Sequence, residues 1–418
     1  MKIRIQTPLF LSTFLTPIPY LGLASVLGLR DFFRIVFTKG RFLHLLVGNC
    51  LFLISLVLLA NLARDVALSY EEMKRLAVIA CSLTTGLYFI SRVSLHEYTH
   101  LQKNQVILFL SFGWLVSSLV FWELPLTAQY ANYSWYKFAG ASALILCLLQ
   151  VYAISKLRNS VTIWILLGIS ITTISIFNGA KSFALLTLIL MFLRVGLGTA
   201  LNVRNGSYVN FVSRRFRLVR TILVTAVTIG IIVFLARGGW LGTRLEILSG
   251  QYGSNFAESF FRARPEFTYS TQILKDLPFL GYGTVSDPFN HINIQLVTSS
   301  SLTFQEQHFL LNRILVDGFN LHSWTFDLVV RAGFLCFIPI LWYAFLLIRT
   351  IFSFELISNY PGLTFICIVC LEDLFFSPYS WFVSIQIAMS FLAIYLSHQF
   401  LIAEREMRSG VKSQYNHN

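Results

Sequence analysis

Residues Leu43 to Leu62 read LHLLVGNCLFLISLVLLANL, a run without any Asp, Glu, Lys or Arg. The hydrocarbon core of a bilayer is about 30 Å thick and a helix rises about 1.5 Å per residue, so a run of this length matches one crossing. The run lacks the two-residue alternation of a membrane β-strand, and backbone amides in lipid must be hydrogen-bonded within their own segment. It therefore predicts a membrane-spanning helix.

The whole chain has the same character. Of its 418 residues, 56% are hydrophobic and only 12% are charged, and the mean hydropathy is +0.68, values that soluble globular proteins rarely reach. We therefore expect an all-α, polytopic integral membrane protein with about 11–12 transmembrane helices. The other apolar windows predict spans at Leu9–Leu29, Leu76–Ile90, Gln105–Trp122, Phe138–Ile154, Val161–Phe177, Phe183–Leu201, Thr221–Ala236, Phe326–Leu347, Leu363–Phe376 and Trp381–Ile402.

The net charge of +13 indicates topology rather than nucleic-acid binding, because Lys and Arg lie mainly in short segments between apolar runs. The segment before Thr221 is rich in arginine, which predicts that it stays in the cytoplasm. Counting from it, other basic segments also fall inside: Arg30 to Arg41, Lys156 with Arg158, Arg349, and the tail after Ile402. The stretch from Gly238 to Leu321 then lies outside.

The side of the amino terminus stays open. An odd number of spans places it outside, whereas Lys2 and Arg4 favour the inside. Pro17 and Pro19 interrupt the first apolar run, which is therefore either a re-entrant pair of half-helices or a wrongly divided region. We do not expect a cleaved signal peptide, because the run is long and lacks a small-x-small site.

The outer stretch of about 85 residues is long for a connection in a compact membrane protein, which is typical of a functional loop. We expect three regions: an amino-terminal helix bundle over residues 1–236, a large extracytoplasmic loop with short helices over 237–322, and carboxyl-terminal helices with a cytoplasmic tail over 323–418.

No metal site is predicted. All six cysteines fall in or beside apolar runs, and Cys367 with Cys370 is better interpreted as one face of a helix than as a metal pair. His96 and His100 in HEYTH have the spacing of a zinc pair but lack the HExxH order and lie in a predicted cytoplasmic connection.

A histidine and several cations on the outer side are candidates for chemistry. His322 precedes a predicted helix with Ser323 as its N-cap, a position that favours a neutral imidazole able to accept a proton, although it also suits a purely structural hydrogen bond. Arg262 and Arg264 suit phosphate binding or simple solvation. Lys181 opens an apolar run at the outer face, where it meets an anionic substrate or a lipid headgroup.

The order of these features resembles the O-antigen polymerase and ligase family of bacterial envelope glycosyltransferases. The stretch FNGAKSFALLTLIL is similar to the family's polar motif that opens a span, with Lys181 in place of the usual arginine. Arg264, followed by Pro278 and the turn Gly281-Tyr282-Gly283, resembles the family's loop signature, and Arg262 is the competing match for its arginine. His322-Ser323 before DLVVRAGFL resembles its HN motif, with serine in place of asparagine.

The resemblance implies a GT-C-like fold and a metal-independent glycan transfer, without a cofactor, from an undecaprenyl-diphosphate carrier in the bacterial inner membrane. Lys181 and Arg264 would hold the departing diphosphate with help from Arg262 or Arg244, and His322 would be the base. Tyr252, Phe267 and Tyr282 are suited to stacking on sugar rings. The implied partners are the lipid-linked oligosaccharide, the bilayer and a chain-length regulator protein, with no nucleic acid.

Three functions stay open. A polymerase extends another lipid-linked repeat, and the absence of the usual arginine and asparagine favours it over a ligase, which transfers glycan to the lipid A core. A transporter or flippase of lipid-linked sugars predicts charged residues along a path within the spans and symmetry between the two halves. The sequence has most charges at span ends and unequal halves, which favours transfer over transport.

Overall fold

The computed structural model describes residues 11–13, 23–38, 41–63, 65, 70–94, 98–120, 140–155, 160–178, 180–198, 279–281, 324–376 and 383–415. Within these ranges the regular structure is helical and contains no strand. Five helical segments there are long and apolar enough to cross a membrane: Arg41–Ala63, Leu76–Ser94, His100–Val120, Phe334–Ile351 and Ile385–Ala403. The expectation of an all-helical protein with several membrane-spanning segments is confirmed at this level.

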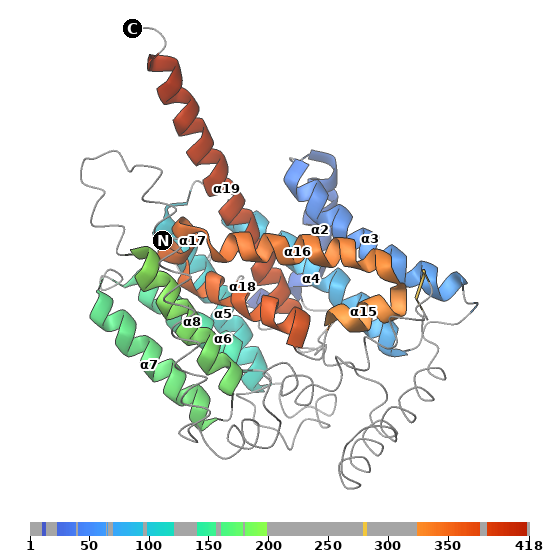
Figure 1. The fold of residues 1–418 in the computed structure, drawn as a ribbon, viewed down its shortest axis with the longest axis horizontal. Helices are drawn as coiled ribbons and strands as arrows, with labels where there is room; N and C mark the ends of the chain where they lie inside the picture. The colour runs from blue at the N-terminus through green and yellow to red at the C-terminus, as the bar shows by residue number, and fades with distance from the viewer. Residues whose placement is uncertain are drawn as a thin grey trace, which may run out of the picture.

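The described helices form one assembly (Figure 1). They are α2 (Leu23–Thr38), α3 (Arg41–Ala63), α4 (Tyr70–Ser94), α5 (His100–Val120), α6 (Ala141–Ile154), α7 (Val161–Phe177), α8 (Lys181–Gly198), α15 (Trp324–Ala332), the 3-10 helix η5 (Phe334–Cys336), α16 (Phe337–Ile351), α17 (Phe354–Asn359), α18 (Pro361–Phe376) and α19 (Val383–Tyr415).

Long uninterrupted apolar runs predict their helices well. The run Leu43–Leu62 lies within α3, and the predicted span Val161–Phe177 coincides with α7. The amino end of α7 has a local cause, because the Ser160 side chain accepts a hydrogen bond from the Ile163 amide. The predicted span Thr221–Ala236 and nearly all of the large loop lie outside the described residues.

The amino-terminal prediction is wrong in its boundaries. We expected a span to end at Leu29 and a basic connection to follow, but α2 continues to Thr38 and includes Arg30 and Arg34. The helix continues because it packs along α4, where the Ser91 hydroxyl donates a hydrogen bond to Asp31 Oδ2 at 2.6 Å. The Asp31 carboxylate therefore has a hydrogen-bond donor although it lies within a helix.

The predicted single span Phe326–Leu347 is also wrong, because two helices cover it. The first, α15, ends at Ala332, and the chain turns at Gly333 with φ 87° and ψ 179° before η5 and α16 begin. This backbone conformation is nearly exclusive to glycine and cannot continue a helix. The short helix α17 between α16 and α18 was not predicted either.

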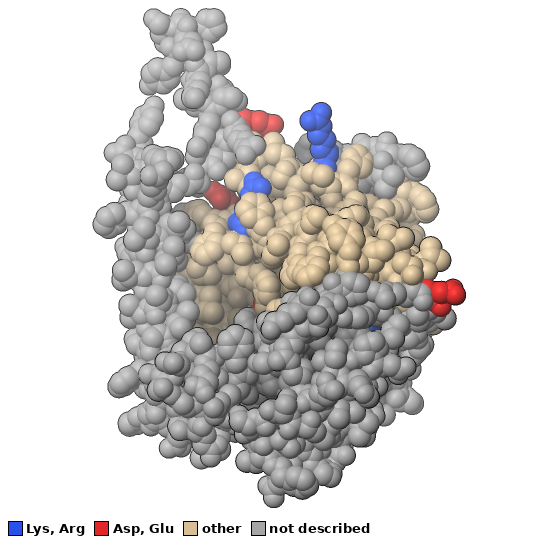
Figure 2. Space-filling model, turned by 45° about the vertical axis from the view of Figure 1, so that its right-hand side comes forward, with Lys and Arg blue, Asp and Glu red and all other residues tan. Residues whose placement is uncertain are grey.

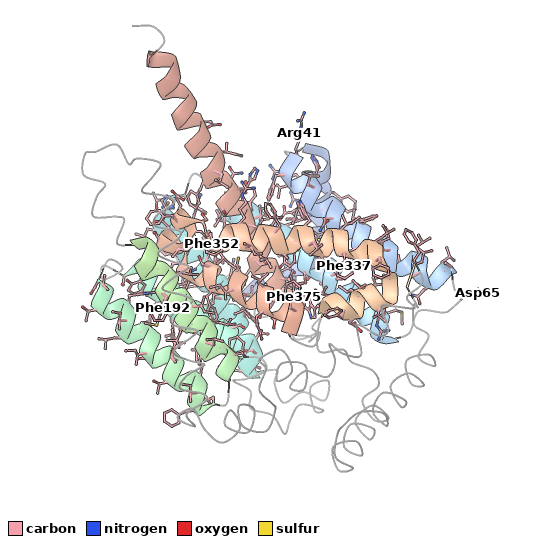
Figure 3. All side chains as sticks on the ribbon, viewed as in Figure 1. Arg41, Asp65, Phe192, Phe337, Phe352 and Phe375 are labelled. Carbon is pink, nitrogen blue, oxygen red and sulfur yellow. The ribbon has the colours of Figure 1, made fainter. Side chains whose placement is uncertain are left out.

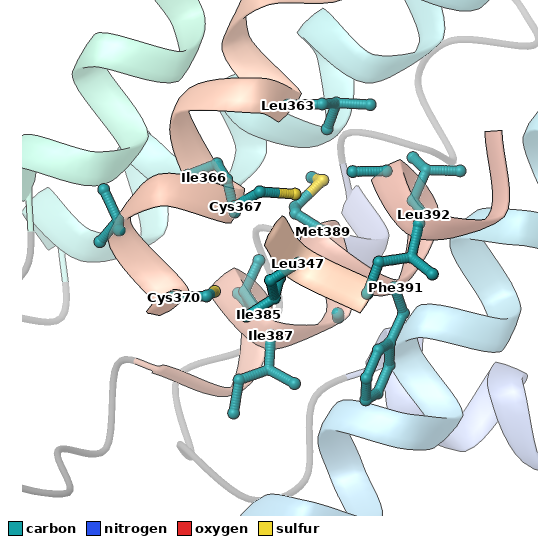
Figure 4. Packing of buried hydrophobic residues seen from close by; sticks show 14 of the residues in the cluster. Leu347, Leu363, Ile366, Cys367, Cys370, Ile385, Ile387, Met389, Phe391 and Leu392 are labelled. Atoms are coloured by element: carbon teal, nitrogen blue, oxygen red, sulfur yellow. The ribbon is translucent and has the colours of Figure 1, made fainter. Parts of the chain in front are cut away.

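The core lies around α18, which packs against α6, α8, α15, α16, α17 and α19. Cys367 and Cys370 are buried on α18, among Leu347 of α16 and Met389 of α19 (Figure 4). The interpretation of these two cysteines as packing residues is confirmed.

Apolar side chains also cover much of the outer surface. On α3, α7 and α16, side chains such as Leu45, Leu166 and Phe345 are exposed. The face in Figure 2 shows few charged residues among the described part of the chain. Exposed apolar surface of this extent is typical of contact with lipid.

Two ends of the assembly can be distinguished by the residues that lie there. Arg41, at the start of α3, lies at the top of the view in Figure 3, on the side where α19 projects from the body. Phe375, at the end of α18, lies nearer the other side, as does α15 (Figures 1 and 3). We call this second end the Asp373 end, after the carboxylate in the last turn of α18.

Candidate functional site

A chain of polar side chains joins three helices at the Asp373 end. Ser142, near the start of α6, lies 3.1 Å from Gln386 Oε1, near the start of α19. The Gln386 amide nitrogen in turn donates a hydrogen bond to Asp373 Oδ2 on α18. We call these residues the Ser142–Gln386–Asp373 chain.

Helix ends explain why these residues meet. Asp373 lies in the last turn of α18, where the partial negative charge of the helix terminus opposes a carboxylate. A donor from another element therefore stabilises it, and Gln386 in the first turn of α19 supplies one. Ser142 and Gln386 are only 6% and 5% exposed. The hydrogen bonds among Ser142, Gln386 and Asp373 therefore offset the free-energy cost of removing these polar groups from water.

The helix that follows His322 is attached to the same end of α18. α15 begins at Trp324, and its Thr325 hydroxyl donates a 2.8 Å hydrogen bond to the carbonyl oxygen of Leu374, the neighbour of Asp373. Within α15, Arg331 Nε lies 3.1 Å from Asp327 Oδ1. Asp327 lies in the first turn of α15 and Arg331 in its last, so each side chain also suits the helix terminus beside it.

The helix that begins with Lys181, α8, lies beside the helix that contributes Ser142. Ala180 packs against Ala141, and both are buried, so the start of α8 lies beside the start of α6. Ala141 precedes Ser142 in the sequence. The backbone of Lys181, as the first residue of α8, therefore lies next to the helix that contributes Ser142.

α15 is attached to the Asp373 end of α18, whereas the start of α8 contacts α6 through Ala180 and contacts α18 through Phe183, whose ring lies 6.4 Å from that of Phe365. α15 starts two residues after His322, and both α8 and α15 pack on α18 directly. The predicted residues Arg244, Arg262, Arg264 and His322 lie outside the described residues, as do Tyr252, Phe267 and Tyr282. Of the predicted loop signature, Gly281 is described.

Asp373 and Gln386 were not predicted as site residues. A signal for Asp373 is present in the sequence, since Glu372 and Asp373 interrupt an apolar run and ionisable residues within membrane segments are commonly functional. Gln386 and Ser142 have no comparable signal, because amide and hydroxyl side chains also occur in helix packing.

The described part of the chain contains no group of three His, Cys, Asp or Glu side chains placed to hold a metal ion. His100 of the HEYTH segment lies with Nδ1 3.0 Å from the Tyr360 hydroxyl, and its ring stacks on Phe400. This contact joins α5 to the corner between α17 and α18.

No family model matches the chain, and no curated protein or solved structure shows a significant similarity to it. The structure itself defines the class: an all-helical protein whose described part includes five segments suited to crossing a membrane.

Proposed function

We propose that the chain is a membrane glycosyltransferase that polymerises oligosaccharide repeat units carried on undecaprenyl diphosphate. One observation supports it most: α15, which begins two residues after His322, is attached at the end of α18 that carries Asp373, and the start of α8 with Lys181 packs beside the start of α6, which contributes Ser142 to the polar chain. In this proposal the chain has about 11–12 spans in a GT-C-like arrangement and lies in the bacterial inner membrane, with its large loop in the periplasm.

The reaction breaks the bond between the anomeric carbon and the diphosphate oxygen, and forms a glycosidic bond to an acceptor hydroxyl. Negative charge develops on the departing diphosphate, where Lys181 and Arg264 stabilise it with help from Arg262 or Arg244. His322 accepts the proton of the attacking hydroxyl. No step requires a metal or a cofactor.

The Ser142–Gln386–Asp373 chain adds a role for sugar recognition. Carboxylate and amide groups accept from and donate to sugar hydroxyls, and a site that is partly shielded from water strengthens these hydrogen bonds. We assign Asp373 and Gln386 to positioning the acceptor sugar, beside the groups that hold the diphosphate.

A transporter of lipid-linked sugars is the second candidate. Asp373 and Gln386 lie within the helix bundle, and such residues also occur along transport paths. The purified protein in detergent with one defined lipid-linked repeat separates these functions. A polymerase forms longer carrier-linked glycans without a second compartment, whereas a transporter leaves the repeat unchanged.

A ligase is distinguished by its acceptor. Deletion of a polymerase removes the glycan ladder and leaves one repeat on the acceptor, whereas deletion of a ligase accumulates long carrier-linked chains. The assay in detergent also tests the site, since His322→Ala, Arg264→Ala and Lys181→Ala should each reduce chain extension at least a hundredfold. Arg349→Ala, a cation change at the predicted cytoplasmic side, is the control and should extend normally.

A further inference from the structure

Two glycines meet where the described part of the large loop contacts the helices. The turn Phe279–Gly281 lies against Gly333, at the junction between α15 and η5. Gly281 has φ 70° and Gly333 has φ 87°, a region that other residues rarely adopt. The two positions are more than 50 residues apart in the sequence.

The contact is between backbones. A Cβ added to Gly281 would lie 2.5 Å from the Gly333 amide nitrogen and closer still to the Arg331 carbonyl oxygen. A Cβ added to Gly333 would lie 2.8 Å from the Gly281 nitrogen and closer still to the Phe279 carbonyl oxygen. Main-chain atoms cannot move aside as a flexible side chain does, so both positions require glycine.

The junction that receives the loop is itself held in place. The Gly333 amide donates a 2.7 Å hydrogen bond to the Val329 carbonyl oxygen, which closes α15. α15 packs against α3 and α18, and Asn49 of α3 donates a 3.0 Å hydrogen bond to the Pro339 carbonyl oxygen in α16. The loop turn therefore contacts a point that is fixed relative to the Asp373 end of α18.

We propose that Gly281 and Gly333 are positioning residues for glycan transfer. Their backbone contact, which we call the Gly281–Gly333 clasp, anchors the turn Phe279–Gly281 to the junction after α15. The anchor fixes this turn relative to α15, the helix that begins two residues after His322. This role rests on the proposed transferase function, but the contact itself is testable without any activity.

The first test measures turnover per folded molecule. Gly281→Ala and Gly333→Ala should each lower kcat for chain extension at least tenfold, with less change in KM. Because both substitutions break the same contact, the kcat of the double variant should lie within about threefold of the kcat of the less active single variant. Gly48→Ala is the matched control, since a Cβ added there meets nothing within 4 Å, and it should keep full activity.

Thermal unfolding of each variant separates positioning from general stability. Variants that lose folded protein but keep normal kcat per folded molecule would overturn the positioning role. If the loss of kcat in the double variant equals the product of the two single losses, the two glycines do not act through one shared contact.

The second test needs no activity. Cysteines replacing Phe279 and Phe334, which are 65% and 41% exposed, flank the clasp and should be joined by a short bis-maleimide. Five native cysteines are buried and Cys81 is half-buried, so they compete little for the reagent. Adding Gly333→Ala to the pair should lower the yield of cross-linked protein at least fivefold.

Absence of cross-linking in the parent pair would overturn the clasp whatever the activity. Efficient cross-linking in a protein that never extends glycan would instead support the clasp as a contact and overturn the proposed transferase function.

Discussion

Helices α7 and α18 have nearly the same length, 17 and 16 residues, and both are mainly apolar, yet they have opposite surroundings. α7 packs mainly against α8 and exposes Leu166, Ile169 and Phe177. α18 is enclosed by other helices and carries Asp373 at its end. Lipid can surround an apolar helix whose backbone hydrogen bonds are complete, whereas polar groups lie where neighbouring helices supply hydrogen bonds.

The largest effect is expected from a charge placed on the exposed face of α7. Ile169 is 52% exposed near the middle of the helix. If this face meets lipid, Ile169→Asp should disfavour insertion by about 3 kcal/mol, and the fraction of chain that resists alkaline extraction from membranes should fall sharply. Ile169→Leu should insert normally. Normal insertion of the aspartate variant would mean that α7 faces water.

The enclosed helix should respond to removal of its polar group. Asp373→Ala leaves the buried Gln386 amide without its acceptor, which should cost about 2 kcal/mol of stability and lower chain extension at least tenfold. Asp373→Asn keeps an acceptor and should lose less stability. Thermal unfolding measures the change in stability, and product length measures the change in chain extension. An alanine variant that matches wild type in both would show that Asp373 has neither role.

A smaller effect tests the attachment of α15. Thr325→Val keeps the shape of the side chain but removes its hydrogen bond to the Leu374 carbonyl oxygen, which should cost about 1 kcal/mol in unfolding free energy. Ser170 on α7 bonds to the Leu166 carbonyl oxygen at 2.9 Å in an exposed position. Ser170→Ala should therefore change stability by less than about 0.5 kcal/mol. Equal losses of stability in Thr325→Val and Ser170→Ala would contradict the difference in surroundings between α18 and α7.

An effect of the same size as that of Thr325→Val is expected at the other end of α18, and it depends on pH. Burial raises the pKa of the Tyr360 hydroxyl above its ordinary value of 10.0. The unfolded chain therefore loses this proton first, so the contribution of Tyr360 to stability is complete below about pH 10 and declines as pH rises beyond it. Tyr360→Phe, which also loses the hydrogen bond to His100, should be less stable by about 1 kcal/mol at neutral pH.

Denaturant unfolding at several pH values measures this difference. The gap between wild type and Tyr360→Phe should narrow above about pH 10. A gap that stays constant with pH would show that the hydroxyl is not buried in the folded protein.

The sequence predicts the helices whose apolar runs are continuous. The limits of α3 and α7 follow from hydropathy and, for α7, from the cap at Ser160. Prediction was wrong at Gly333, where a glycine inside an apolar run ends α15, because hydropathy does not reveal a positive φ. It was also wrong for α2, whose charged residues are accommodated by contacts with α4.

The candidate site was only partly predictable. Lys181 stands out because a cation opens an apolar run, and the structure places it at the start of α8. The hydrogen bonds from Gln386 to Asp373 and from Thr325 to Leu374 depend on which helices are neighbours, and a single sequence does not contain that information.

The most direct measurement is an experimental structure of the protein in a lipid nanodisc with a bound lipid-linked repeat. The proposed glycosyl transfer requires the diphosphate within about 4 Å of the Lys181 and Arg264 side chains, with His322 and Asp373 at the same end of α18 and facing the sugars. Placement of Lys181 and His322 on opposite sides of the bilayer, or a diphosphate bound away from both, would contradict it.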